Sequence, residues 1–216
     1  MKRIKKNKLL RYMAIAIVAL TLALVARITH AYLTLDINEM MSKVNLKSDI
    51  VDEFKFIQGD PLNLEATPSN LEENGENLTV ISKPTITLKA NGTTNEAKYN
   101  YYIYLEIPTN TFTYTTENQT PEIILNITDA NGNPMTNITG LDYGTTNGVT
   151  GFDITSYSGT ITIADNLEIL SNSSTETTIH EYTITLTYLN LDVDQSANYG
   201  KKLNTNIVIS KNAKAE

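Results

Sequence analysis

Few side chains in this 216-residue sequence are of the types that catalyse reactions or bind metals. It has no cysteine and two histidines, His30 and His180. No second histidine stands four residues after the His180-Glu181 pair, so the two-histidine zinc face of a helix is missing. The spacing of Asp and Glu is compatible with a glycosidase-like carboxylate pair, although no segment favours one. With no phosphate loop or nucleophile elbow either, we expect a non-enzymatic protein without a cofactor or metal.

Two acidic loops are candidates for calcium binding. Asp129-Ala130-Asn131-Gly132-Asn133 begins with alternating oxygen ligands, but glycine stands at its fourth position and Gly140 occupies the twelfth, where a calcium loop has glutamate. Asp192 and Asp194 follow a predicted strand and offer further carboxylates. An Asn-Gly hairpin explains the first loop and an ordinary turn explains the second, so we assign no metal to either.

Tyrosine is the remaining informative residue type. Four of the twelve tyrosines, Tyr99, Tyr101, Tyr102 and Tyr104, lie in one short segment. A row of exposed aromatic rings can bind glycans or a partner strand, but such rings also stabilise sheets by cross-strand pairing, worth roughly 0.2–1 kcal/mol per pair. The stabilising interpretation is the stronger one.

The element that positions these tyrosines is a predicted strand at Tyr99–Pro108. Tyr99, Tyr101, Ile103, Leu105 and Ile107 alternate with Asn100, Tyr102, Tyr104 and Glu106. This period of two is typical of an antiparallel strand with one face buried and the other half in water.

The rest of the sequence predicts partners for this strand. We expect further strands at Glu53–Ile57, Leu78–Ser82, Thr85–Ala90, Thr111–Thr115, Glu122–Asp129, Leu141–Tyr143, Phe152–Thr155, Thr160–Ala164, Glu181–Leu191 and Lys202–Ile209. Gly59–Asn77 reads as a long, partly mobile loop, and Asn38–Val51 as a short helix or an irregular arm. The predicted fold class is all-β, an antiparallel two-sheet sandwich over residues 58–216.

The N-terminus carries an export signal. Residues 1–31 contain no Asp or Glu, and six Lys and Arg residues precede the apolar run Met13–Ala26. As a helix this run spans roughly 21 Å, less than the ~30 Å hydrocarbon core, which favours a signal peptide. Thr29 and Ala31 are small residues at the −3 and −1 positions of a signal-peptidase site, which predicts cleavage between Ala31 and Tyr32. The alternative is an uncleaved signal anchor, lengthened by Leu9, Leu10 and Ile28, with the same topology.

The chain after Ala31 is strongly acidic. It retains 10 of the 17 Lys and Arg residues and all 24 Asp and Glu residues, a net charge of −14. No basic stripe is present to neutralise phosphates, which argues against nucleic acid as a partner. An exported domain without cysteine must be held by its core, which suits a bacterial surface.

Two stretches resemble the TasA/camelysin family of exported bacterial surface and biofilm-matrix proteins. Ala31-Tyr32-Leu33-Thr34 is similar to that family's cleavage junction, although Leu33 replaces the usual aromatic residue and Arg27 is unusual in the signal. Ile86–Ile107 is similar to its sandwich core. The resemblance implies a jelly-roll-like sandwich, export through a dedicated signal peptidase, and fibres in which one subunit's N-terminal strand completes the next subunit's sheet. Some relatives are classed as metalloproteases, a label that the histidine count does not support.

Two functions follow as hypotheses. The favoured one is a structural surface or extracellular-matrix protein that self-associates, or associates with other surface proteins. Its donor strand would be the alternating segment at the mature terminus, Tyr32, Leu33, Thr34, Leu35, Asp36 and Ile37, followed by an arm to residue 57. The alternative is a membrane-anchored monomeric adhesin or ligand-binding module that uses the tyrosine-rich face or the loops.

Overall fold

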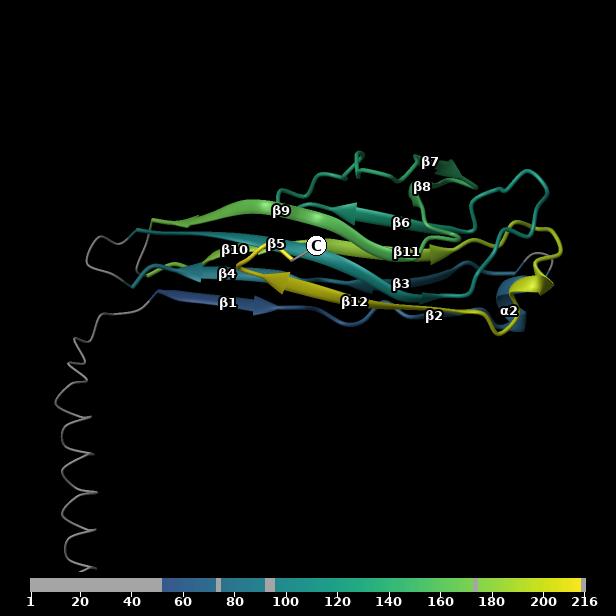
Figure 1. Cartoon of the computed structure of the whole chain (residues 1–216), viewed down its shortest axis with the longest axis horizontal. Helices are drawn as coiled ribbons and strands as arrows, with labels where there is room; N and C mark the ends of the chain where they lie inside the picture. Colours follow the sequence, from purple (N-terminus) through teal and green to yellow (C-terminus); the bar gives the residue numbers. More distant parts are fainter. Residues whose placement is uncertain (1–51, 73–74, 92–95, 173–174, 215–216) are drawn as a thin grey trace, which may run out of the picture. The chain divides into compact units, whose positions relative to one another are not determined.

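The computed structural model describes residues 52–72, 75–91, 96–172 and 175–214, which form a mostly-β fold with three antiparallel sheets and almost no helix (Figure 1). The predicted all-β, antiparallel class is confirmed. The predicted signal or anchor segment at 1–31 and the strand at Tyr32–Ile37 lie outside the described residues. None of the helices in the described ranges is long and apolar enough to cross a membrane.

Two of the sheets are joined end to end. The first has the order β1 (Glu53–Ile57), β4 (Thr85–Lys89), β10 (Thr178–Glu181). The second has the order β3 (Leu78–Ser82), β11 (Thr183–Tyr188), β6 (Ile123–Thr128), β8 (Val149–Asp153), β7 (Tyr143–Thr146). Between them, the Tyr182 N–H donates to the Pro84 carbonyl at 3.0 Å. Pro84 has no N–H, so it cannot donate the second hydrogen bond of this pair, back to the Tyr182 carbonyl. The ladder is interrupted here, and the strand predicted at Glu181–Leu191 is divided into β10 and β11.

The tyrosine-rich strand lies inside the third sheet. This sheet has the order β2 (Leu64–Glu65), β12 (Lys202–Ser210), β5 (Ala97–Asn110), β9 (Gly159–Ser171). The register of β5 shifts against β9 on both sides of Ile103 and against β12 between Asn204 and Asn206. Such bulges increase the local twist of a strand, which lets the long β5 follow both neighbours.

The core draws on all three sheets. From β5 it takes Tyr101, Ile103, Leu105 and Ile107, which agrees with the predicted inward face of that strand. The same core contains even-numbered residues of β4 and β11 and the residue before β11: Ile86, Leu88, Tyr182, Ile184, Leu186 and Tyr188. The odd-numbered positions of β4 and β11 are mostly threonine, as expected for a face that water reaches.

The segment at 59–77 differs from the expected loop. It contains β2 and the short helix α2 (Pro68–Leu71), and it buries Leu62, Leu64 and Ala66 in the core. α2 lies beside the 3₁₀ turn η1 (Ser196–Asn198) at one end of the strands (Figure 1).

The strand predicted at Thr111–Thr115 is wrong. Side chains from other segments bind its backbone instead of a ladder. Asn198 Oδ1 accepts the Thr113 N–H at 3.1 Å, and Glu122 Oε1 accepts the Thr115 N–H. These bonds satisfy the backbone groups that would otherwise require a neighbouring strand.

Candidate functional site

The strongest candidate site is an open sheet edge. Within the described residues, β3 pairs with β11 on one side and with no strand on the other. In an antiparallel ladder, residue pairs that exchange backbone hydrogen bonds alternate with pairs that do not. Tyr182 bonds to Pro84, so the bonded pairs between β11 and β3 fall on the even-numbered residues of β3. The backbone groups of Thr79 and Ile81 therefore point to the open side, where another chain can pair with them.

The edge is open because the chain changes sheets just before it. β1 runs beside β4 as far as Ile57, and a straight continuation would run beside β3. At Gly59, however, φ is +78°, and the chain crosses to the third sheet, where β2 pairs with β12. A Cβ at Gly59 would lie 2.4 Å from Ser82 Oγ and 3.1 Å from the Lys83 nitrogen, so both space and backbone conformation require glycine.

Apolar side chains surround the place where β1 departs. Ile57 and Ile81 are 59% and 56% exposed, unusual values for large aliphatic residues. They line a hollow of about 530 Å³ together with Gln58, Gly59, Asp60, Ser82 and Lys83. Ser82 is 2% exposed, and its hydroxyl has no hydrogen-bond partner among the described residues. A buried hydroxyl without a partner carries a desolvation cost, which an additional strand or ligand with a polar group could relieve.

Of the other edges, those of β1 and β9 are poorer templates for pairing. β1 presents Glu53 and Lys55, which form an ion pair on its exposed side. β9 contains register shifts and a left-handed residue, Asn166, with φ of 51°. Charged and irregular edges resist the addition of further strands. β2 already covers one end of β12.

The tyrosines of β5 divide between the core and the surface. Tyr101 is fully buried, whereas Tyr99 and Tyr102 are half-buried. The Tyr99 ring stacks on Phe54 with centroids 4.8 Å apart. Tyr102 and Tyr104 are parallel at 6.3 Å, and the Tyr102 hydroxyl donates to Asn166 Oδ1. These contacts agree with the sheet-stabilising interpretation of the tyrosine row.

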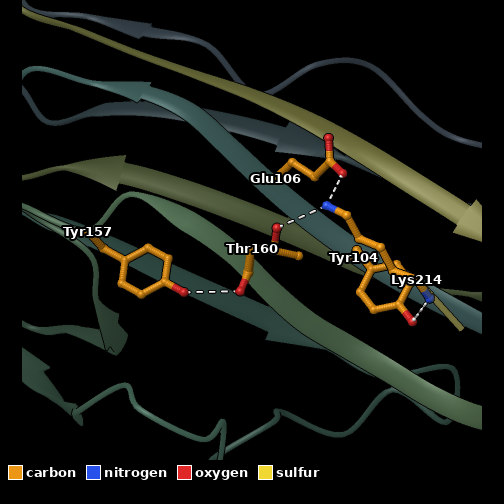
Figure 2. Close-up of polar contacts among 5 residues, drawn as sticks. All are labelled: Tyr104, Glu106, Tyr157, Thr160 and Lys214. Carbon is orange, nitrogen blue, oxygen red and sulfur yellow. Dashed lines mark hydrogen bonds and ion pairs between the residues drawn. The ribbon is translucent and has the colours of Figure 1, made fainter. Parts of the chain in front are cut away.

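The C-terminal segment covers part of the outer tyrosine face (Figure 2). The Lys214 N–H donates to the Tyr104 hydroxyl at 3.1 Å, and its ammonium group donates to Glu106 at 2.6 Å and to Thr160 at 3.2 Å. Tyr104 is consequently 7% exposed although it points away from the core. An aromatic platform for a ligand is therefore not available at Tyr104.

His180 lies between the sheets rather than at the surface. Its Nδ1 is 2.8 Å from the Tyr101 hydroxyl, which is 2.9 Å from the Tyr182 hydroxyl. Burial lowers the pKa of His180 and raises the pKa values of both tyrosines. When the neutral histidine carries its proton on Nε2, Nδ1 accepts the Tyr101 hydroxyl, which in turn accepts the Tyr182 hydroxyl, and the three side chains form a structural network. The alternation of Tyr182, Ile184 and Leu186, extended back by one step, already indicates this inward position.

In both acidic loops an aspartate accepts hydrogen bonds from the loop's own backbone. Asp129 Oδ1 accepts the N–H groups of Asn131 and Asn133, both at 2.9 Å, and these bonds lower the pKa of the carboxyl. Asp194 Oδ1 accepts the Ser196 N–H at 2.9 Å, and its pKa is lowered by its bonds to Ser196. Both carboxylates are thus used to close turns. Among the described residues, no three His, Asp or Glu side chains gather closely enough to hold a metal ion.

The sequence did not reveal a buried carboxylate, Glu122. It is 0% exposed, and all its donors within the described residues are neutral: Thr115 N and Oγ1 on Oε1, and Tyr188 OH, Gln195 Nε2 and Asn198 Nδ2 on Oε2. We call these residues the Glu122 hub. The Tyr188 pKa is raised by burial and by the adjacent carboxylate. The hub joins segments more than 60 residues apart, which no local sequence pattern encodes.

The residues predicted for strand donation and cleavage, Ala31 and Tyr32–Ile37, lie outside the described residues. Comparison of the chain with protein-family models, with curated proteins and with solved structures gives no match.

Proposed function

We propose that this chain is a non-enzymatic, exported surface or matrix protein that self-associates by strand addition, with the β3 edge as the acceptor. The observation that carries the proposal is that edge itself, unpaired on one side within the described residues and flanked by exposed Ile57 and Ile81. Large exposed aliphatic residues beside free backbone groups are what an incoming strand requires.

We infer that the three sheets form the two layers of a jelly-roll-like sandwich. The first and second sheets would constitute one layer, because the Tyr182–Pro84 bond carries the pairing from one to the other. The third sheet would constitute the opposite layer, since Tyr101 on β5 meets His180 on β10. This arrangement supports the fold implied by the resemblance to the TasA/camelysin family.

The predicted donor strand matches the acceptor edge in length and pattern. β3 spans the five residues Leu78–Ser82, and Tyr32–Ile37 has six. Leu78 and Val80 point toward the core but are half-buried, so their side chains have room for apolar neighbours. A donor in antiparallel or parallel register would place Leu33, Leu35 and Ile37 on that inner side and leave its polar face outward.

The experiment uses chains that begin at Tyr32. Leu35→Asp disables the donor. Ile81→Pro disables the acceptor, because proline removes the N–H that points to the open side of β3. Ile179→Pro is the matched control, because Ile179 is 57% exposed and lies on β10, an edge strand of the first sheet. We expect fibres from the wild type and from the control, and monomers from either of the other variants alone. An equimolar mixture of those two variants should stop at heterodimers, because one intact donor meets one intact acceptor.

Sedimentation velocity and negative-stain microscopy distinguish the outcomes. A wild type that stays monomeric at high concentration would reject self-association and favour the anchored ligand-binding alternative. Fibres from the Ile81→Pro variant would show that the acceptor is a different edge. Loss of folding stability on deletion of Tyr32–Ile37 in a monomer would mean that this strand pairs within its own domain.

A further inference from the structure

A polar cleft lies beside β8, away from the β3 edge. Three segments form it: the one before β6, which contributes Tyr114; residues 140–142, which contribute Asp142; and residues 153–158, which contribute Asp153 and Tyr157. Its volume is about 370 Å³. A second hollow of about 260 Å³ shares Asp142 and Asp153, so the two carboxylates stand where the hollows adjoin.

One carboxylate is fixed in place by its neighbours. Asp153 Oδ1 accepts the Thr155 N–H at 2.9 Å and the Thr155 hydroxyl at 2.6 Å, and Oδ2 accepts the Tyr114 hydroxyl at 2.7 Å. Thr155 Oγ1 in turn accepts the backbone N–H groups of Glu122 and Ile123, at 2.8 and 3.0 Å. The cleft is therefore built before any ligand arrives, which lowers the entropy cost of binding.

The other carboxylate is unused. Asp142 is exposed, and within the described residues its carboxylate forms no hydrogen bond, although its carbonyl accepts the Asp153 N–H at 3.0 Å. Burial and the bond to Asp153 raise the pKa of Tyr114, and the nearby charge of Asp142 adds a small further increase. Two carboxylates thus border the cleft: Asp153, which its neighbours hold in place, and Asp142, whose oxygens can accept hydrogen bonds from a ligand.

The chemical character of the residues that line the cleft indicates which class of ligand it can bind. It combines carboxylates with the hydroxyls of Ser156 and Ser158 and the rings of Tyr114 and Tyr157, and neither hollow is lined by Lys, Arg or His. The carboxylates repel anions such as phosphates and uronic acids. Carboxylates bind hydroxyl donors strongly, and an aromatic ring packs against the C–H face of a sugar. The Tyr157 hydroxyl donates to the Thr160 carbonyl at 3.0 Å, which restricts the orientation of that ring (Figure 2).

We propose that this cleft binds a neutral glycan, with Asp142 and Asp153 accepting bonds from sugar hydroxyls and Tyr157 packing against a sugar ring. Two alternatives predict different ligands for the same residues. A divalent cation would use the two carboxylates as ligands, and a polyamine would pair with them as ions.

The test is saturation-transfer NMR of the full chain with maltohexaose, cellohexaose and chitohexaose. We expect saturation transfer to at least one of them, and an affinity at least about tenfold weaker for Asp142→Ala, the expected loss of a hydrogen bond to a charged group. Asp165→Ala is the matched control, because Asp165 is an exposed residue of β9 that does not line the cleft. Its affinity should equal that of the wild type.

Three results would overturn the proposal. The first is the absence of saturation transfer to all three oligosaccharides while circular dichroism shows a folded protein. The second is glycan binding that Asp142→Ala and Tyr157→Ala both leave unchanged, which would place the site elsewhere. The third is calcium or spermine binding that Asp142→Ala abolishes, with no binding of the oligosaccharides.

Discussion

Replacement of Glu122 by glutamine should destabilise the fold more than any other carboxylate-to-amide change in the described residues. The substitution keeps the shape of the side chain but introduces an NH₂ group where the hub offers donors. If that group replaces Oε2, it faces the amide nitrogens of Gln195 and Asn198, now both at 2.8 Å from the oxygen. If it replaces Oε1, it faces the Thr115 N–H instead. The second orientation leaves fewer donors unsatisfied, so we expect the introduced amide to adopt it.

The magnitude follows from that orientation. One buried N–H loses its acceptor, at a cost of about 1–3 kcal/mol, and three bonds to a charged oxygen become bonds to a neutral one, each weaker by about 1 kcal/mol. Removal of a buried charge returns part of this sum, because its desolvation no longer opposes folding. We expect a net loss of about 2–4 kcal/mol, a large share of the ~5–15 kcal/mol that stabilises a typical domain.

The matched control is Glu65→Gln. Glu65 makes an exposed ion pair with Lys202 at 2.9 Å, and such pairs contribute about 0–1 kcal/mol. Urea unfolding of the wild type and both variants at neutral pH gives the comparison, from midpoints at a common slope. A Glu122→Gln protein as stable as the control or the wild type would refute the reasoning, since it would show that desolvation of the carboxylate cancels its five bonds.

Three further predictions test other parts of the structure. Burial lowers the pKa of His180 below its usual value of 6.5, so as the pH falls the unfolded chain takes up a proton at this residue before the folded chain does. The contribution of His180 to folding stability should therefore be full above about pH 6.5 and fall below it. Urea unfolding at several pH values should show no such fall attributable to residue 180 in a His180→Gln variant. Gly59→Ala should cost about 1–3 kcal/mol more than Gly132→Ala, because both have positive φ but a Cβ at Gly132 would meet no atom within 4 Å; equal melting temperatures would contradict the crowding at Ser82. EDTA should leave the melting temperature unchanged, since backbone N–H groups already occupy the Asp129 carboxylate, and a drop of several degrees would indicate a structural ion.

Local alternation was enough to predict most of the strands. The predicted boundaries of Leu78–Ser82 and Glu53–Ile57 match β3 and β1, because each strand alternates in burial along its length. Alternation failed at Thr111–Thr115, where Thr, Phe and Tyr have strand propensity but the side chains of Asn198 and Glu122 bind the backbone. Propensity describes a single segment, whereas these bonds depend on which segments meet.

The candidate sites were less predictable than the strands. The β3 edge is open because the chain turns away at Gly59, and a lone glycine before a proline-containing stretch does not reveal which sheet follows. Glu122 follows a proline and resembles a surface residue by type, but three of the donors to its carboxylate lie between Tyr188 and Asn198. Long-range polar contacts of this kind have no periodic signature.

The place of β12 in the third sheet has a consequence for the order of folding. It is the last strand of the described chain, yet it lies between β2 and β5, with Leu203 opposite Leu64. β2 can therefore pair only with residues that lie about 140 positions later in the chain, and closing a loop of that length slows folding. During synthesis from the N-terminal end, β2 cannot pair with β12 until almost the entire chain has emerged. We expect a chain truncated before Lys202 to collapse without completing its core, and refolding of the intact chain to be limited by the docking of this final strand.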